Sequence, residues 1–169
     1  DGARNWSSGW LPPRHQGVHF RHNGPPVMHL RSETGAPAKV QELRLDLLRT
    51  LNAEHRRQHA IIDPQLEARI ASYELAARMQ TTAARALDLA EETEETQKLY
   101  GLDNPATQSY GRRCLMARRL VERGVRYVQV LIRGQMWDTH SDNANATKKC
   151  CLETDQPTAA LLTDLKRRG

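Results

Sequence analysis

The sequence feature that most constrains the fold is the segment of residues 125–132, which has the sequence VRYVQVLI and directly follows Gly124. β-Branched and other apolar residues dominate it, and such nearly continuous apolar character is typical of a strand in a sheet that helices cover. Helical patterns flank the segment, and the order helix, glycine turn, strand, loop, helix is that of an α/β fold. We therefore predict an α/β fold that is mostly helical, with one or two buried strands.

Glycine and proline divide the chain of 169 residues into three parts. Residues 1–38 are punctuated by both residue types, which oppose helix formation, so we expect an irregular loop segment with a short strand at residues 17–21. Residues 39–123 form a predicted helical segment, and residues 124–169 are expected to form a strand, a loop and a helix. We assign all three parts to a single domain over residues 1–169.

Apolar spacing and capping signals predict the helices. The clearest stripe consists of Val40, Leu43, Leu47 and Leu51, which are three or four residues apart. The predicted helical segments cover residues 39–60, 64–81, 83–89, 105–123 and 157–169, and a further short helix ends at Gly101. Gly124 is expected to cap the helix that precedes the predicted strand.

Composition limits the classes of function. The net charge of +5, from 25 Lys and Arg and 20 Asp and Glu residues, mildly favours anionic ligands. We expect no nucleic-acid partner, because such a partner needs a clustered basic stripe and the acidic residues 91–95 interrupt the pattern. The chain has no run of about 18 apolar residues, so we expect no membrane span. The three cysteines argue against a full disulfide framework.

The residues best suited to chemistry are Trp137, Asp138, Thr139 and His140, which follow the predicted strand. In open α/β sheets, ligands bind beyond the carboxyl ends of the strands. A carboxylate oxygen and an imidazole nitrogen suit zinc, manganese or iron, so Asp138 and His140 are the candidate metal ligands. The alternative interpretation is an aspartate that caps a turn beside a surface histidine.

Other polar clusters are weaker candidates. Asp142 and Asn143 either orient the metal ligands or serve as ordinary turn residues. A basic helix face is expected to be solvated surface, with recognition of phosphate or sulfate as the alternative. A histidine cluster lies in the irregular segment, whose glycines and prolines argue against the helical spacing that a metal site there would need. The two clusters are Arg112, Arg113, Arg118 and Arg119, and His15, His19, His22 and His29.

Five stretches carry a resemblance to a known protein family, and they cover residues 5–12, 15–17, 66–80, 114–127 and 137–140. In this order the chain resembles the domain-of-unknown-function 1501 family, a group of sulfatase-like bacterial proteins of the alkaline-phosphatase superfamily. The resemblance extends over nearly the whole chain, and the combination of stretches is specific. It implies that the chain is an internal fragment of one sulfatase-like domain with a partial alkaline-phosphatase-like fold.

The resemblance also implies a function. Members of the superfamily carry out metal-dependent chemistry on phosphate or sulfate esters, and an Asp and His pair before a helix commonly binds the metal. Asp138 and His140 match that order, although they are two residues apart where the alkaline-phosphatase pattern has a wider gap. The Gly-Gly-Pro-Ser and Gly-Glu-Phe-Gly-Arg stretches of the family pattern are not in this sequence, so the catalytic residues stay unassigned.

These observations lead to one main expectation and one alternative. We expect a metal-dependent hydrolase of sulfate or phosphate esters that uses a divalent metal ion, with zinc, manganese and calcium left open. Its substrate would be an anionic ester or a sulfated glycan, and the fragment alone is expected to be inactive. The alternative is a non-catalytic domain that binds anionic polysaccharide. The resemblance further implies an extracytoplasmic location, periplasmic or secreted, for the parent protein.

Overall fold

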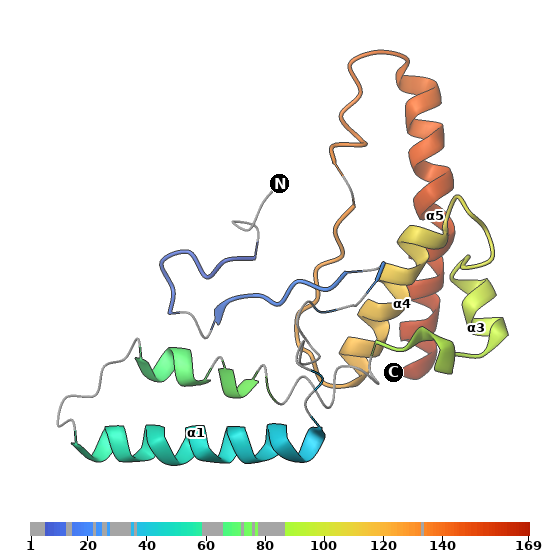
Figure 1. Ribbon diagram of the computed structural model, residues 1–169. Helices are drawn as coiled ribbons and strands as arrows, with labels where there is room; N and C mark the ends of the chain where they lie inside the picture. The colour runs from blue at the N-terminus through green and yellow to red at the C-terminus, as the bar shows by residue number, and fades with distance from the viewer. Residues whose placement is uncertain are drawn as a thin grey trace. The chain divides into compact units, whose positions relative to one another are not determined.

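The computed structural model divides the chain into two compact units. The described residues are 6–12, 15–21, 23–24, 27, 35, 37–58, 66–71, 73–75, 77, 87–132 and 134–169. The first unit comprises residues 1–21 and 25–82, and the second comprises residues 22–24 and 83–169 (Figure 1). Among the described residues, no helix is both long enough and apolar enough to cross a membrane.

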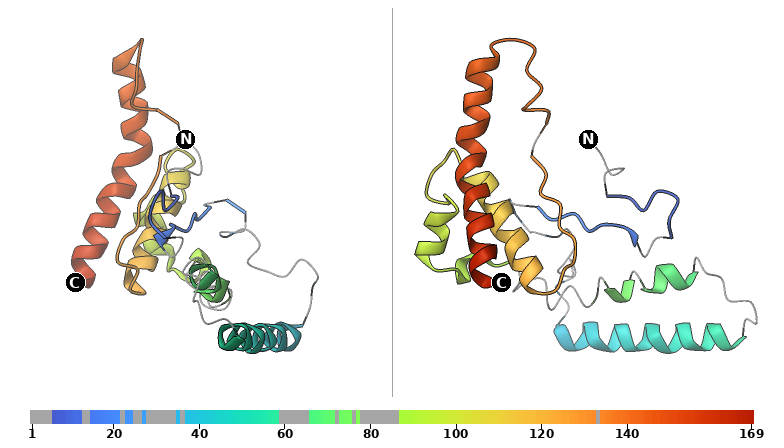
Figure 2. Two further views of the ribbon diagram at one scale, coloured as in Figure 1. Left: turned by 90° about the vertical axis from the view of Figure 1, so that its left-hand side faces the viewer. Right: turned by 180° about the vertical axis from the view of Figure 1, so that it is seen from behind.

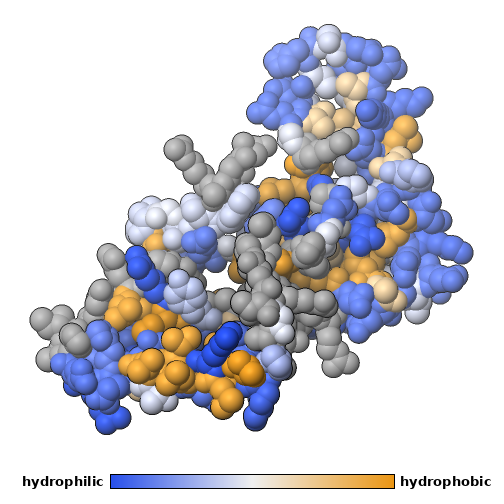
Figure 3. Space-filling model, viewed as in Figure 1, coloured by the Kyte–Doolittle hydropathy of each residue, from blue (hydrophilic) through white to orange (hydrophobic). Residues whose placement is uncertain are grey.

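The first unit contains helix α1 (Ala38–Gln58), which confirms the helix predicted over residues 39–60. Leu43, Leu47 and Leu51 share one face, because residues four apart lie above one another on a helix. Leu43 and Leu47 are each 59% exposed. Figure 3 shows apolar side chains gathered over α1. The predicted stripe therefore exists, but it lies at the surface of the unit.

A second helical stretch in this unit agrees with the helix predicted over residues 64–81. The described helical residues in it are 66–71, 73–75 and 77. Arg56 Nε of α1 donates a hydrogen bond of 2.6 Å to Glu67 Oε1, which links the two helical stretches. Ala68 and Ile70 are buried. The rest of this predicted helix, and most of the short segment predicted over residues 83–89, lie outside the described residues.

The described part of the irregular segment is held by contacts around Trp6. Gly17 N donates to Trp6 O over 2.9 Å, and the rings of Trp6 and His19 stack with centroids 4.6 Å apart. A Cβ atom on Gly17 would lie 3.2 Å from Trp6 Cβ, so only glycine fits this close approach comfortably. Residues 17–21 lie within the described part of the chain and do not form a strand, so the short strand predicted there is wrong.

The second unit is a pair of packed helices with a short helical arm. Helices α4 (Gln108–Glu122) and α5 (Asn143–Arg168) lie side by side in all three ribbon views (Figures 1 and 2). The arm consists of η3 (Leu89–Glu91), which contacts α4, and α3 (Glu94–Leu99), which contacts α5. The buried apolar side chains of this core include Leu89, Tyr100, Leu102, Cys114, Leu115, Leu120 and Ala160.

Glycines end α3 and α4 as the sequence predicted. Gly124 has a φ of +85°, a left-handed conformation that glycine adopts at low cost. Gly124 N donates to Val121 O and Val125 N donates to Leu120 O, the two hydrogen bonds of a Schellman motif. Gly101 has a φ of +68° just after α3.

Two helices begin at residues other than those predicted. Helix α4 begins only at Gln108, because Asn104 Oδ1 accepts a hydrogen bond of 3.0 Å from Ala106 N and forms a local turn. Helix α5 begins at Asn143 and contains Pro157, the residue near which we predicted its start. Pro157 is almost fully buried, and its packing offsets the hydrogen bond that proline removes from a helix.

The largest correction concerns the predicted buried strand. Residues 125–132 have no partner strand, and the part of the chain that the structure describes contains no strand or sheet. Val125 and Leu131 are each 40% exposed and Tyr127 is 78% exposed. β-Branched residues favour a strand only where a neighbouring strand completes the ladder and pairs with their side chains. The predicted α/β, partial alkaline-phosphatase-like fold with buried strands is therefore wrong for the described residues, which are mostly helical.

Candidate functional site

Asp138 and His140 lie close together in the loop that leads to α5. A turn over residues 134–137 precedes them, and Asp138 N donates to Gln135 O over 2.9 Å. Asp138 Oδ1 lies 3.4 Å from His140 Nε2. The Asp138 and His140 side chains are 56% and 88% exposed, so a solute can reach both. The structure thus brings the two predicted ligands together at the surface.

Thr139, between the two candidate ligands, is held by the first residue of α5. Its hydroxyl donates a hydrogen bond of 2.6 Å to Asn143 Oδ1, and the Thr147 hydroxyl donates to the same oxygen over 3.2 Å. Asn143 therefore links the loop to the first turns of α5. Of the two roles that the sequence left open for Asn143, this contact favours support of the motif.

Asp142 serves as a turn residue at the start of α5. Its φ is +48°, a left-handed conformation that aspartate tolerates better than most residues. The Asp142 carboxylate accepts hydrogen bonds of 2.8 and 3.0 Å from Asn145 Nδ2, and Asp142 O accepts from Ala146 N over 3.1 Å. These local bonds account for Asp142 without a role at the candidate site.

The donor types and spacing of Asp138 and His140 fit a divalent metal ion. Two ligand atoms at about 2.1 Å from a tetrahedral zinc ion stand about 3.4 Å apart. The observed separation of Asp138 Oδ1 and His140 Nε2 is 3.4 Å. Two ligands do not complete a zinc site, which takes about three or four protein ligands. Within the described ranges, no group of three or more His, Cys, Asp or Glu side chains could hold a metal ion.

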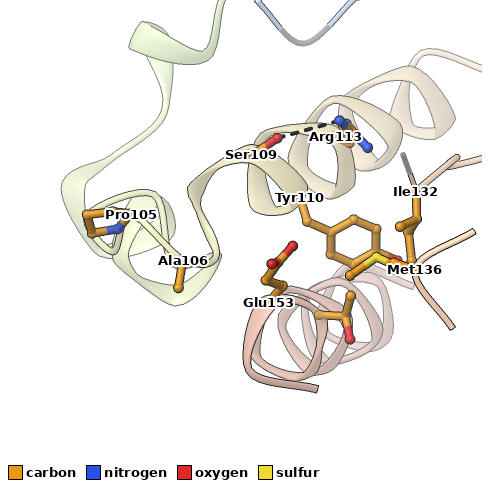
Figure 4. A pocket seen from close by; sticks show the side chains of 9 residues that line it. Pro105, Ala106, Ser109, Tyr110, Arg113, Ile132, Met136 and Glu153 are labelled. Carbon is orange, nitrogen blue, oxygen red and sulfur yellow. Dashed lines mark hydrogen bonds between the residues drawn. The ribbon is translucent and has the colours of Figure 1, made fainter. Parts of the chain in front are cut away.

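A pocket of about 220 Å³ lies between the loop and the two long helices. Its lining consists of Pro105, Ala106, Ser109, Tyr110, Arg113, Ile132, Met136, Glu153 and Thr154. Figure 4 shows Tyr110 reaching from α4 toward Ile132 and Met136 of the loop. The loop that precedes the candidate site therefore spans a partly hollow region.

Arg118 and Arg119 do not form the solvated surface that the sequence predicted. Their side chains are only 2% and 5% exposed. Arg118 donates to Glu92 over 2.6 Å and to Glu122 over 2.7 Å. Arg118 Nε lies 3.2 Å from Asp164 Oδ2. Neither guanidinium faces the solvent from which an anionic polysaccharide would approach.

These arginines belong to a larger group, named here the ion cluster. Arg119 pairs with Glu91 over 2.8 Å and also with Glu92. Arg168 bridges Glu122 and Asp164 at 2.7 and 2.8 Å. The Tyr100 hydroxyl donates to Asp164 Oδ2 over 3.1 Å. The ion cluster comprises Glu91, Glu92, Tyr100, Arg118, Arg119, Glu122, Asp164 and Arg168.

The ion cluster controls the protonation of its buried members. Burial alone would raise the pKa of Glu92, but hydrogen bonds from Arg118 and Arg119 outweigh burial and lower that pKa. Burial also opposes ionisation of Asp164, yet hydrogen bonds from Arg168 and Tyr100 lower its pKa. Burial, together with the charge of Asp164, raises the pKa of Tyr100. The two carboxylates are therefore held in their ionised form by the arginines around them.

The remaining predicted residues occupy other positions. Arg112 and Arg113 are half-buried on α4. His15 and His19 are exposed, and His19 stacks on Trp6. The two other members of the histidine cluster, His22 and His29, lie outside the described residues, so a metal site there stays an untested alternative.

Comparison with known proteins identifies one family. The family model described as Protein of unknown function (DUF1501) matches residues 1–169. The chain belongs to the DUF1501 family. The resemblance of the five sequence stretches to the DUF1501 family is thereby confirmed. A search of curated proteins and a search of solved structures each gave no match.

In this DUF1501 chain, the ion cluster is the feature that the sequence interpretation missed. Its contacts join residues as far apart as Tyr100 and Asp164, which are 64 positions apart, so local spacing gives no indication of them. One signal was present. Arg118 follows the buried Cys114 by four residues, and residues four apart share a helix face, so Arg118 had to lie on the core side of α4.

Proposed function

We propose that this chain carries part of the metal site of a metal-dependent hydrolase of sulfate or phosphate esters. The observation that carries the proposal is the 3.4 Å separation of Asp138 Oδ1 and His140 Nε2 on an exposed loop. Family membership adds support through the sulfatase-like resemblance of the sequence. The other ligands would come from residues beyond those that the structure describes.

The donor types narrow the choice of metal. Asp138 offers a hard carboxylate oxygen and His140 a borderline imidazole nitrogen, a combination that suits zinc or manganese. Calcium takes oxygen ligands almost exclusively, so the imidazole makes calcium the weakest of the three candidates. When bound, such an ion polarises an ester oxygen and stabilises charge on the transferring group.

The residue between the two donors is hydrogen-bonded to α5. The hydrogen bond from the Thr139 hydroxyl to Asn143 Oδ1 fixes the residue between the two donors to α5. Held in this way, Asp138 and His140 lose less conformational freedom when they bind an ion. Their exposure admits a large substrate, such as one with an ester group on a sulfated glycan.

The metal content of the complete protein tests the proposal. Purified wild type, Asp138→Ala and His140→Ala would be compared by plasma mass spectrometry. We expect about one zinc or manganese ion per chain in wild type. Each variant should lose most of that metal, because it lacks one of the roughly three or four protein ligands that a zinc site takes. Hydrolysis of para-nitrophenyl sulfate and phosphate should follow the metal content.

Asp155→Ala is the matched control, because Asp155 is an exposed aspartate on the same helix that the motif precedes. It should keep the wild-type metal content. A folded wild type whose bound metal survives both Asp138→Ala and His140→Ala would show that the pair is not part of the site.

A further inference from the structure

The loop that carries Asp138 and His140 depends on the two long helices for its position. Its extended part, residues 125–132, has no strand partner in the described part of the chain. Two of its carbonyl groups instead accept hydrogen bonds from side chains. Arg113 Nη1 of α4 donates to Leu131 O over 2.7 Å, and Cys150 Sγ of α5 donates to Met136 O over 3.0 Å. Each long helix thus supplies one tether.

The pocket beneath the loop makes these tethers important. Ile132 and Met136 line this pocket of about 220 Å³. Ile132 directly follows Leu131, and Met136 itself bears the second tethered carbonyl. A loop packed on a solid core is held by contacts along its whole length, because protein interiors are close-packed. Here the pocket removes some of the packing contacts beneath the loop. The two hydrogen bonds to its carbonyl groups therefore contribute a larger share of what holds the loop in position.

The Cys150 tether lies close to the candidate ligands. Met136 precedes Asp138 by two residues, and Trp137 stands between them. Cys150 is only 4% exposed, so its thiol hydrogen bond is shielded from competing water. A change at Met136 O therefore passes to Asp138 through a single intervening residue.

We propose that Cys150 and Arg113 are positioning residues for the Asp138–His140 site. They hold the loop at Met136 O and Leu131 O and so set where the two donors stand relative to α5. The consequence for metal affinity rests on the proposed function, whereas the position of the loop can be measured without any metal.

Fluorine NMR of the complete protein labelled with fluorotryptophan tests the inference. Trp137 is half-exposed and follows the tethered Met136 directly, so its resonance reports the loop position. Trp137→Phe identifies that resonance. We expect Cys150→Ala to shift the Trp137 resonance and to weaken zinc binding by about tenfold. Cys150→Ser keeps a hydroxyl donor and should recover most of both properties.

Neighbouring residues provide the controls. Cys151→Ala changes the next residue, which projects from α5 about 100° away, and should alter neither the resonance nor zinc binding. Arg113→Met keeps the length of the side chain but removes its donors. It should shift the Trp137 resonance less than Cys150→Ala does, because Leu131 is farther than Met136 from Trp137 along the chain.

The outcomes separate this inference from the proposed function. An unmoved Trp137 resonance in a folded Cys150→Ala protein would overturn the tether, and unchanged zinc affinity despite a shifted resonance would overturn its role at the site. A wild type that binds no zinc would overturn the metal function, while the resonance would still decide the tether. If Cys150→Ala fails to fold, Cys150→Ser and Arg113→Met carry the test.

Discussion

At the scale of single residues, Arg118 is enclosed by carboxylates from three separate parts of the second unit. Glu92 follows η3, Glu122 lies on α4 itself, and Asp164 comes from α5. Removing a charge from water is costly, and the cost is recovered only when the partners and their hydrogen bonds are complete. The three carboxylates supply most of these partners, and the guanidinium joins three elements. Arg118 Nε lies 3.2 Å from Asp164 Oδ2 but makes no hydrogen bond within the described part of the chain.

Substitution of Arg118 should therefore destabilise the fold strongly. Arg118→Met keeps the volume of the side chain but leaves the half-buried Glu92 and the buried Asp164 without this cation. We expect a loss of about 3–5 kcal/mol in the free energy of unfolding, measured by urea denaturation. Arg112→Met, on the same helix at a half-buried position, should cost less than about 1 kcal/mol. Equal costs for the two variants would contradict the importance of the ion cluster.

At the scale of elements, local patterns predicted what local interactions decide. The leucine stripe predicted α1, and Gly124 predicted the end of α4, because periodicity and capping involve only neighbouring residues. The strand at residues 125–132 failed because a strand needs a partner that its own sequence cannot supply. The prediction that α5 starts near Pro157 was wrong, because burial of this proline in the core outweighs the usual preference of proline for the first turn of a helix.

The same distinction applies to the candidate site. Asp138 and His140 are two positions apart, and the structure indeed places their side chains together. The tether from Cys150 to Met136 O spans 14 positions, and no local pattern marks it. Sequence reasoning therefore singled out Asp138 and His140, whose side chains lie close together, but it did not find the hydrogen bond from Cys150 to their loop.

Gly111 gives a prediction at the element scale. It is buried on α4, and a Cβ atom there would clash with the backbone carbonyl of Tyr100. Gly111→Ala should therefore lower the free energy of unfolding by about 1–3 kcal/mol, although alanine is the better helix former. Ser109→Ala, at an exposed position two residues earlier on α4, should be nearly neutral in the same urea titration. A stabilised Gly111→Ala protein would show that α4 can move away from Tyr100.

At the scale of the whole molecule, the two units differ in the interactions that stabilise each of them internally. The described part of the first unit leaves the leucines of α1 exposed, whereas the second unit has a buried core and the ion cluster. Four carboxyl groups face three guanidinium groups in that cluster. Apolar contacts do not titrate, whereas these charged groups do. The free energy of unfolding of the second unit should therefore depend on pH.

The direction of this response follows from Glu92 and Asp164. Both pKa values are lowered on folding, from ordinary values of 4.5 and 3.8, so the folded state releases protons that the unfolded chain keeps in acid. The contribution to stability is complete above the ordinary values and is lost as the pH falls through the lowered ones. We expect urea-unfolding free energies to be steady between about pH 7 and pH 5 and to fall below about pH 4.

Glu92→Gln checks the cause of that acid response. The amide cannot ionise, so the variant should be less stable than wild type near neutral pH and should lose less stability on acidification. An acid response of unchanged steepness in Glu92→Gln would assign the effect to carboxylates outside the ion cluster.

The ion cluster also fixes the axial register of α5 on α4. Aliphatic side chains are nearly interchangeable, so apolar contact alone tolerates a helix that slides by one turn, about 5.4 Å. Such a slide would part Asp164 from both Arg118 and Tyr100 and leave charges stranded. Asn143 lies about 30 Å from Asp164 along the same helix. The charged residues near the C-terminus of α5 thus set the axial position, relative to α4, of the Asp138–His140 loop near its N-terminus.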